Sequence, residues 1–234
     1  MSTQYALVLN SGSSSIKFQV IDPKADSTEP PFVSGIVEKI GEMSGHIKIQ
    51  TETTKMEDTR PILSHSVGLE RAFGMMSLLG VGPQELDLCA VGHRVVHGGE
   101  EFHAPELIEG DVLDRLKALI PLAPLHNPAS ALGLRAIQKK WPHMPQVCVF
   151  DTAFHRSMPE HVWRYALPEE MYSEYGVRRY GFHGTSHDYV TGEAARFLGV
   201  ERDSFDAVVA HLGNGASATA IIDKVQRQLH YWAS

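Results

Sequence analysis

Basic residues, cysteines and long apolar runs are all scarce in this sequence, and each shortage argues against a class of protein. The chain has 21 Lys and Arg against 28 Asp and Glu, a formal net charge of -7, whereas nucleic-acid binders usually carry a basic excess. No apolar run approaches the roughly 18 residues that a membrane helix needs. The start, MSTQYALVLN, lacks the basic flank and apolar stretch of a secretion signal. We therefore expect a cytoplasmic protein that binds neither nucleic acid nor membrane.

The two cysteines, Cys89 and Cys148, each lie in an apolar run. We expect buried free thiols in a reducing compartment, with a disulfide or a nucleophilic thiol as alternatives. Histidine is abundant instead, with 13 residues, which suits acid–base chemistry or metal binding without deciding between them. The length of 234 residues fits one large domain, or one domain and part of another.

Alternating apolar and polar residues predict an antiparallel meander at the start of the chain. Strands over 5–9 and 16–21 flank a Gly/Ser-rich turn at 10–15, which is typical of a hairpin. Segments near 32–40 and 46–53 also have an extended pattern. The chain therefore opens with several strands paired in sequence order.

Helices and strands then alternate. We expect helices over 66–79, 127–140 and 186–198, and strands over 86–91, 147–151, 207–212 and 217–222. Asn127 is expected to cap the second helix with Pro128 at its first position, and Gly199 ends the third. Strand, turn and strand recur near Gly213, which suggests two similar domains, 1–150 and 151–234. The tail 223–234 has no glycine and no second helix or strand to pack on, so the second domain is expected to stop after about 80 residues.

The turn after the first strand has residues suited to phosphate binding. Successive small residues expose backbone N–H groups, and Ser13 and Ser15 add hydroxyl donors. Lys17 adds positive charge, and the oxygen of Asn10 can help to hold a hydrated Mg²⁺. A flexible hairpin turn with a solvated lysine is the alternative. Neither a P-loop nor a G-x-G-x-x-G fingerprint occurs.

Two further residues suit anion binding. Arg94 follows a buried apolar strand and is flanked by glycines, so it can grip a carboxylate with two hydrogen bonds; a structural salt bridge is the alternative. His126 precedes a helix N-terminus, which favours anions. A histidine bonded to a nearby backbone carbonyl is equally compatible with that position.

Asp151 and His183 complete the set of candidate residues. Asp151 ends a buried strand, where open α/β sheets place ligands, and it can orient a metal, polarise an attacking group or cap the next turn. His183 and His187 have the spacing of a zinc pair, but the glutamate of H-E-x-x-H is absent. His183 lies on a glycine-rich loop beside two arginines, which suits stabilisation of negative charge. No G-x-S-x-G elbow of a serine hydrolase occurs.

Six segments stand in the order and spacing of one family: LNSGSSSIKF, GHRVVHGGE, LAPLHNP, VFDTAFHRSMPE, RRYGFHGTSH and AHLGNGAS. From about Tyr5 to Ile222 the chain resembles the acetate kinase family. The resemblance implies an α/β fold: a ribonuclease H-like (actin-like ATPase) domain with a mixed sheet, followed by an incomplete second domain of the same type. It also implies reversible phosphoryl transfer from ATP to acetate with Mg²⁺, giving acetyl phosphate and ADP.

Carried over by position, the resemblance implies a Mg²⁺ ligand at Asn10 and acetate binding at Arg94. His126 would lie beside the transferring phosphoryl group, Asp151 would be the catalytic carboxylate, and His183 would stabilise the transition state. Residues implied to contact the nucleotide are Lys17, Ser13, Ser15, His211, Leu212, Gly213, Asn214 and Gly215.

The resemblance ends near Ile222, whereas family members continue much further. Their continuation carries another catalytic arginine, a glycine-rich adenine-binding segment and an acidic Mg²⁺ ligand, and residues 223–234 match none of these. We therefore expect a C-terminally truncated chain with an acetate-binding domain at 1–150 and a partial nucleotide-binding domain at 151–234. An inactive remnant, a propionate kinase and a histidine-rich metal protein are the alternatives. The family also implies a homodimer, formed largely through the second domain.

Overall fold

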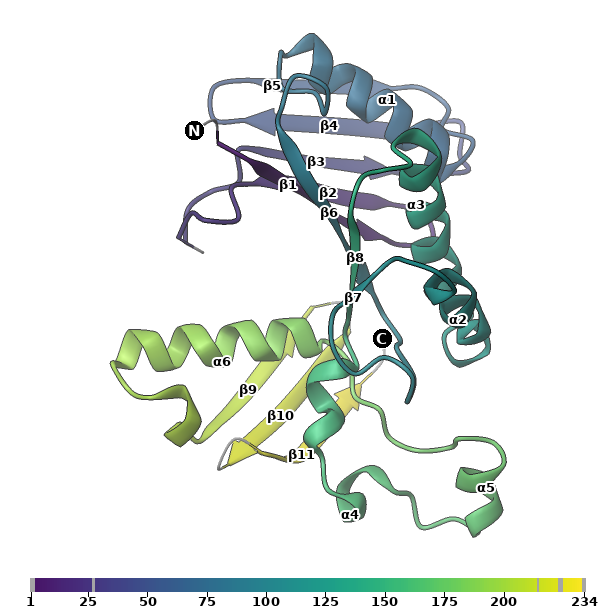
Figure 1. The fold of residues 1–234 in the computed structure, drawn as a ribbon, viewed down its shortest axis with the longest axis vertical. Coiled ribbons are helices and arrows are strands. Elements are labelled where there is room, and N and C mark those ends of the chain that lie inside the picture. Colours follow the sequence, from purple (N-terminus) through teal and green to yellow (C-terminus); the bar gives the residue numbers. More distant parts are fainter. Residues whose placement is uncertain (1–2, 27, 214, 223–224, 233–234) are drawn as a thin grey trace. The chain divides into compact units, whose positions relative to one another are not determined.

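The structure is a computed structural model that describes residues 3–26, 28–213, 215–222 and 225–232, the last range by its backbone alone. Two compact units divide the chain (Figure 1). Unit 1 comprises Met1–Val95 and Glu106–Val149, and unit 2 comprises Val96–Pro105 and Phe150–Ser234. The domain boundary expected between residues 150 and 151 stays a prediction.

A mixed sheet forms the centre of unit 1, in the order β5-β4-β3-β2-β1-β6-β8-β7. Strands β1 to β5 pair antiparallel in sequence order, which confirms the predicted meander. β1 also pairs parallel with β6, so the sheet is mixed. The strands are β1 (Tyr5–Ser11), β2 (Ile16–Ile21), β3 (Val33–Glu38), β4 (His46–Thr51), β5 (Lys55–Thr59), β6 (Leu88–Val95), β7 (Glu106–Leu107) and β8 (Gln146–Phe150).

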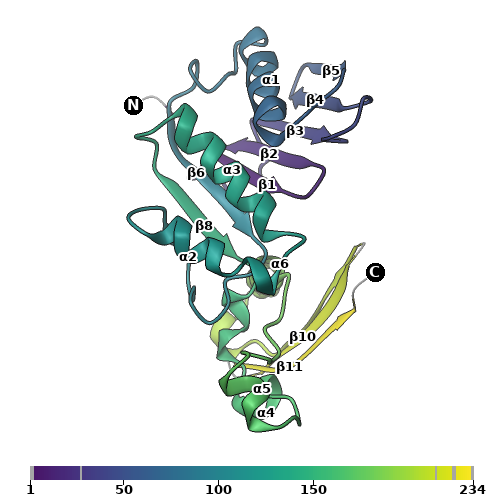
Figure 2. The same cartoon turned by 90° about the vertical axis from the view of Figure 1, so that its right-hand side faces the viewer.

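Helices α1 (His65–Leu78) and α3 (Asn127–Lys140) pack together over one face of this sheet (Figure 2). The side chains on that face are buried, among them Leu7, Leu9 and Phe18, and full burial of one such side chain contributes about 1.5–3 kcal/mol. α2 (Val112–Ala118) and the 3₁₀ turn η1 (Ile120–Leu122) precede α3. Side chains along β1 and β2 alternate between the two faces of the sheet. Every second side chain therefore projects from the face that α1 and α3 do not cover.

Unit 2 contains a three-stranded antiparallel sheet in the order β11-β10-β9, with α6 packed on β9. The pairing of β9 with β10 confirms the second strand–turn–strand opening. The elements are η2 (Ala153–Ser157), α4 (Glu160–Trp163), α5 (Glu169–Ser173), α6 (Gly184–Leu198), η3 (Arg202–Ser204), β9 (Ala207–Leu212), β10 (Ala216–Ile222) and β11 (Val225–Trp232).

One local prediction is wrong, and one strand was not predicted. α3 begins at Asn127, but His126 is the N-cap residue, no side-chain cap bond forms, and Asn127 is fully buried, so burial decided the position of this side chain. The tail also forms a strand that no sequence pattern predicted, since β11 pairs along β10. Pairing satisfies backbone groups that β10 would otherwise leave open at a sheet edge.

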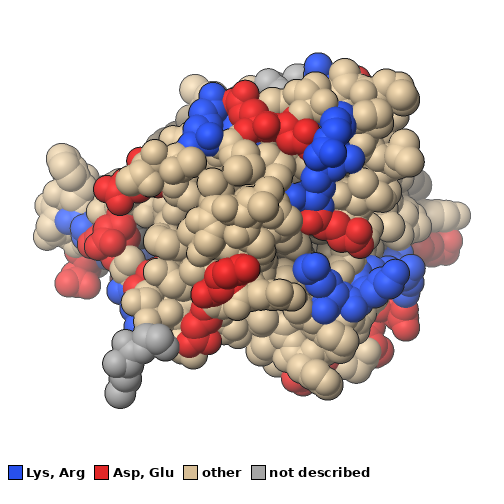
Figure 3. All heavy atoms as spheres, turned by 90° about the horizontal axis from the view of Figure 1, so that it is seen from above, with Lys and Arg blue, Asp and Glu red and all other residues tan. Residues whose placement is uncertain are grey.

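The surface carries charges of both signs, and both cysteines are free thiols, as the sequence predicted. Acidic and basic side chains are interspersed on the face shown in Figure 3. Exposed ion pairs such as Lys55–Glu57 also occur. Cys89 and Cys148 are both free, and Cys148 is buried while Cys89 is half-buried. Burial raises the pKa of the Cys148 thiol to about 12, so this thiol is inert. Among the described residues, no helix combines the length and apolarity needed to cross a membrane.

Candidate functional site

Three predicted site residues form a row across neighbouring strands of unit 1. Asn10 on β1 pairs in register with Lys17 on β2 and with Arg94 on β6. Residues paired in this way project from the same face of a sheet. Nη1 of Arg94 donates a hydrogen bond to Oδ1 of Asn10 at 3.1 Å. The fold therefore brings together an arginine and an amide that lie 84 residues apart in the chain.

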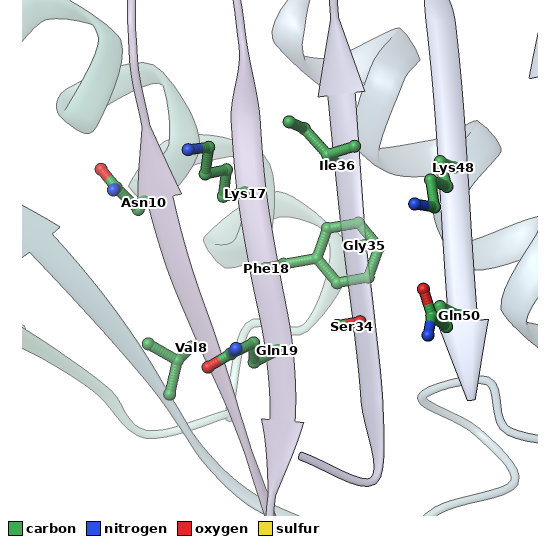
Figure 4. Close-up of a pocket in the computed structure, with 10 residues that line it drawn as sticks. All are labelled: Val8, Asn10, Lys17, Phe18, Gln19, Ser34, Gly35, Ile36, Lys48 and Gln50. Carbon is green, nitrogen blue, oxygen red and sulfur yellow. The ribbon is translucent and has the colours of Figure 1, made fainter. Parts of the chain in front are cut away.

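This row lies on the sheet face that the helices leave open. Leu9 and Phe18, the neighbours of Asn10 and Lys17 in sequence, are buried on the other face. Asn10 and Lys17 line a hollow of about 380 Å³ (Figure 4). The other lining residues are Val8, Phe18, Gln19, Ser34, Gly35, Ile36, Lys48 and Gln50. The lining thus contains two lysines, three amides and apolar side chains.

The predicted phosphate turn between β1 and β2 is fastened at several points. The backbone N–H of Gly12 donates to the carbonyl of Ser15 at 2.8 Å, and that of Ile40 donates to Ser14 at 3.0 Å. Nε2 of His65 donates to the carbonyl of Gly12 at 2.7 Å. The turn is therefore held in one conformation, with Ser13 exposed and Ser15 half-buried. No sequence pattern had singled out His65.

His126 lies at the N-cap of α3 and is exposed. Its carbonyl accepts the backbone N–H of Ala129 at 3.1 Å, as expected of an N-cap residue. Oγ of Ser130, in the first turn of α3, approaches the carbonyl of Arg94 at 3.5 Å. The helix end that carries His126 is thus attached to the strand that carries Arg94.

In unit 2, Asp151 is fully buried directly after β8. Its Oδ1 accepts a hydrogen bond from the Thr185 hydroxyl at 3.2 Å, and its carbonyl accepts the backbone N–H of Gly184 at 2.9 Å. Both donors belong to the first turn of α6, where the helix dipole favours a carboxylate. A Cβ on Gly184 would lie 2.2 Å from the Asp151 carbonyl oxygen. Glycine is therefore required for this approach.

His183 is the N-cap residue of α6 and has a left-handed backbone, with φ 56° and ψ 23°. For a residue other than glycine this conformation costs about 1–3 kcal/mol, and such strain gathers at functional sites. Nδ1 of the ring lies 2.9 Å from Oγ of Ser217. The ring also stacks on His211 with centroids 4.0 Å apart, and Nδ1 of His211 lies 2.9 Å from Oγ of Ser186.

His187 is fully buried on the next turn of α6. Its Nε2 lies 2.8 Å from the same Ser217 oxygen. Burial, reinforced by His155, His183 and His211, lowers the pKa of His187 to about 4, against a raising effect of Asp151. The ring is therefore neutral near pH 7. His183 and His187, which have the spacing of a zinc pair, share a serine hydroxyl instead.

Metal ligands are not gathered in this cluster. Within the described part of the chain, no three or more His, Cys, Asp or Glu side chains are grouped so that they could hold a metal ion. Nε2 of His155 donates to the carbonyl of Phe182 at 2.8 Å. Ser217, His155 and the role of His187 were missed by sequence reasoning, because only the packing of α6 on the sheet brings these residues together.

Two further histidines are buried and neutral. His97 in unit 2 packs against the rings of Tyr180 and Phe182, and its Nδ1 accepts the Gly99 N–H at 2.9 Å. Burial lowers its pKa to about 4. His93 in unit 1 lies 2.9 Å from Oε1 of Gln146, and burial lowers its pKa to about 4 although that hydrogen bond opposes the shift. Both lie near Arg94 in sequence without being candidates for chemistry.

The predicted nucleotide loop lies at the end of the β9–β10 hairpin. His211 and Leu212 are the last residues of β9, and Leu212 is exposed. The backbone N–H of Gly213 donates to the carbonyl of Gly215 at 3.0 Å, so the turn is tight. Asn214 lies outside the described residues. The assignment of these residues to nucleotide binding stays a prediction.

Known proteins resemble this chain along nearly all of its length. Acetate kinase of Corynebacterium jeikeium (strain K411) is 64% identical over 219 residues, which cover 94% of this chain and 54% of that protein. Acetate kinase of Kocuria rhizophila is 52% identical over 225 residues, or 92% of this chain and 54% of that protein. The chain therefore spans about half the length of the curated relatives it matches.

Crystal structures give the same result. An acetate kinase from Porphyromonas gingivalis matches with a TM-score of 0.87 and 41% identity, covering 97% of this chain and 57% of the other. A propionate kinase from Francisella tularensis subsp. tularensis SCHU S4 matches with a TM-score of 0.89 and 40% identity over the same shares. These matches confirm the expected α/β, ribonuclease H-like fold class. Residues 5–225 match the acetokinase family, and the chain belongs to that family.

Proposed function

We propose that this chain provides the acetate-binding part, and some of the catalytic residues, of an acetate kinase. The reaction is reversible phosphoryl transfer from ATP to acetate, giving acetyl phosphate and ADP. The observation that carries the proposal is the row of Arg94, Asn10 and Lys17 on one open sheet face. It combines a carboxylate-binding cation, a metal-binding amide and a phosphate-binding cation on adjacent strands.

Arg94 is proposed to bind the acetate carboxylate. Its guanidinium offers several N–H donors in a plane, a geometry that matches two carboxylate oxygens, and one of these donors is directed to Asn10. This hydrogen bond also limits the rotation of the guanidinium group. Acetate would then be held with its charge neutralised and one oxygen directed to the phosphoryl group.

Asn10 is proposed to contact Mg²⁺. Its side chain offers a hard oxygen, which suits this ion, and Mg²⁺ usually keeps several waters and binds few protein ligands together with phosphates. The donor set therefore fits a hydrated ion carried by the nucleotide. When bound, Mg²⁺ would neutralise charge on the phosphate oxygens. Lys17, Ser13 and Ser15 would contact those oxygens from the fastened turn.

The residues of unit 2 are proposed to act on the transferring group. His183 would donate a hydrogen bond to an equatorial phosphoryl oxygen. For His126, in unit 1, the proposed role is to offset phosphoryl charge. Asp151 would orient a donor or a metal-bound water through its buried carboxylate. The segment from His211 to Gly215 would contact the nucleotide.

The chemistry needs positioning more than a base. Acetate is already an anionic nucleophile: one of its oxygens forms a bond to the γ-phosphorus while the bond from phosphorus to the ADP oxygen breaks. The difficulty is to bring two anions together, and cations with oriented hydrogen-bond donors reduce that repulsion. We further propose a cytoplasmic protein that works as a homodimer; the two free thiols agree with a reducing compartment.

The test is to incubate the folded chain with ATP, Mg²⁺ and acetate and to trap acetyl phosphate as the hydroxamate. We expect product, and at least a 100-fold loss of kcat/KM for acetate in Arg94→Ala, because the carboxylate loses its charged partner. Lys48→Ala is the matched control, because Lys48 lies on the same face of the sheet two strands beyond Lys17. Equal losses in both variants would contradict the role of Arg94.

Two outcomes separate the alternatives. Acetate binding without turnover would show that this chain by itself is a non-catalytic part of the enzyme. A preference for propionate would favour the activity named for the Francisella structure. Because one methylene changes specificity by only about 1–3 kcal/mol, both substrates must be measured at several concentrations to compare kcat/KM.

A further inference from the structure

The hydroxyl of Ser217 connects two histidines of unit 2. Its Oγ lies 2.9 Å from Nδ1 of His183 and 2.8 Å from Nε2 of His187. Ser217 is fully buried on β10, and both histidines belong to the N-terminal end of α6. A serine hydroxyl has one proton to donate and can accept hydrogen bonds from others. It must therefore accept from at least one ring.

The surroundings of His187 decide which ring donates. Its ring is neutral near pH 7, because burial lowers its pKa to about 4, so it carries one N–H. Nδ1 of His187 is buried and, among the residues that the structure describes, has no hydrogen-bond partner. A proton at Nδ1 would be a buried donor without an acceptor, which native structures largely avoid. The proton therefore lies at Nε2 and is donated to Ser217.

The Ser217 proton is then free to be donated to Nδ1 of His183. With Nδ1 accepting, neutral His183 carries its own proton at Nε2, on the other side of the ring. We infer that Ser217 and His187 are positioning residues that hold His183 in this tautomer. This inference rests on the proposed function only for its consequence: a donor at Nε2 can stabilise a phosphoryl oxygen, whereas a lone pair at that position would repel it.

Two other features fix the plane of the same ring. The left-handed backbone of His183 sets the direction in which its side chain leaves the N-terminus of α6. The ring stacks on His211, with an interplanar angle of 26°. Backbone and stacking thus orient the imidazole, while the hydrogen-bonded chain through Ser217 selects which nitrogen bears the proton.

The variants for the test are Ser217→Ala, His187→Leu and His187→Gln. The first two break the chain, while the glutamine amide can reach the Nε2 position and donate to Ser217. Thr219→Val is the matched control: Thr219 is also fully buried on β10, two residues further along, but its hydroxyl has no hydrogen-bond partner within the described part of the chain. Circular dichroism and a thermal transition select the variants that remain folded.

The first measurement is ¹⁵N NMR of the histidine rings, at a pH at which His183 is neutral, with its signals assigned from a His183→Gln sample. We expect protonated Nε2 and unprotonated Nδ1 in the wild type, and a mixture of tautomers in Ser217→Ala and His187→Leu. His187→Gln and Thr219→Val should keep the wild-type pattern. A wild-type ring protonated at Nδ1, or Ser217→Ala signals identical to wild type, would overturn the inference.

The second measurement is the kinetics of acetyl phosphate formation. We expect kcat to fall about tenfold or more in Ser217→Ala, with KM for acetate unchanged, because part of one transition-state hydrogen bond is lost. Thr219→Val should keep the wild-type kcat. If the wild-type chain forms no product, the proposed function fails for this chain, and the ring signals alone still decide the role of Ser217.

Discussion

The two units position their candidate residues by different means. In unit 1, strand register places Arg94, Asn10 and Lys17 side by side on an open face. In unit 2, hydrogen bonds from the N-terminal turns of one helix to Asp151 and Ser217 place the histidines. A row of this kind depends on regular backbone pairing and tolerates changes around it, whereas a buried polar cluster depends on every partner.

The largest expected effect is a loss of stability in acid. His97 and His187 in unit 2 and His93 in unit 1 have pKa values lowered to about 4, against an ordinary value near 6.5. Between these values the unfolded chain binds more protons than the folded chain, so the free energy of unfolding falls as the pH falls from about 6.5 to 4. At the full shift, each histidine contributes on the order of 3 kcal/mol.

Amide NMR spectra recorded stepwise from pH 7 to pH 4 test this comparison. Because unit 2 contains two of these histidines and unit 1 contains one, amides of unit 2 should lose their native signals at a higher pH. His93→Gln is expected to reduce the acid sensitivity of unit 1 without changing that of unit 2. If the amides of both units lost their native signals at the same pH, the two units would unfold together.

The next effect comes from a single methyl group. Gly184→Ala places a Cβ against the Asp151 carbonyl, and we expect a loss of roughly 2–3 kcal/mol in the free energy of unfolding, since overpacking against backbone is costly. Gly92→Ala on β6 is the counterpart in unit 1, because a Cβ there would have no atom of the described residues within 4 Å, apart from its own chain neighbours. Its stability should change by less than about 0.5 kcal/mol.

Urea unfolding with linear extrapolation measures both glycine variants. If Gly184→Ala left the free energy of unfolding unchanged, the first turn of α6 would be able to move away from Asp151. In that case Thr185 would also be a weak partner of the carboxylate, and Thr185→Val should be neutral as well.

The smallest effect concerns the turn of unit 1. His65→Leu removes the donor to the Gly12 carbonyl and should lower the free energy of unfolding by about 1 kcal/mol. Under the proposed function, it should also raise the KM for ATP, because the turn loosens. The amide of the glutamine in His65→Gln can donate to the same carbonyl. This variant should therefore keep most of the wild-type stability and a KM for ATP close to that of the wild type. If the KM for ATP were unchanged in His65→Leu, the turn would not contribute to phosphate binding, and His65 would act only on stability.

Local pattern predicted most of the regular structure. β2, α3 and β9 have the expected bounds, because alternation of period two and the helical stripe depend only on neighbouring residues. The missed features involve burial or pairing. Asn127 is not the cap residue because it is buried, and β11 forms because β10 offers it a pairing edge.

In the candidate site, too, local sequence determined some contacts and the tertiary structure decided the others. The sequence by itself determined the hairpin that places Asn10 beside Lys17, because a short turn between two alternating strands leaves little choice of register. Only the tertiary structure decided that Arg94 bonds to Asn10 and that Ser217 joins His183 to His187. These partners lie 84, 34 and 30 residues apart. Burial of apolar faces decides which distant strands and helices become neighbours, and no local pattern encodes that choice.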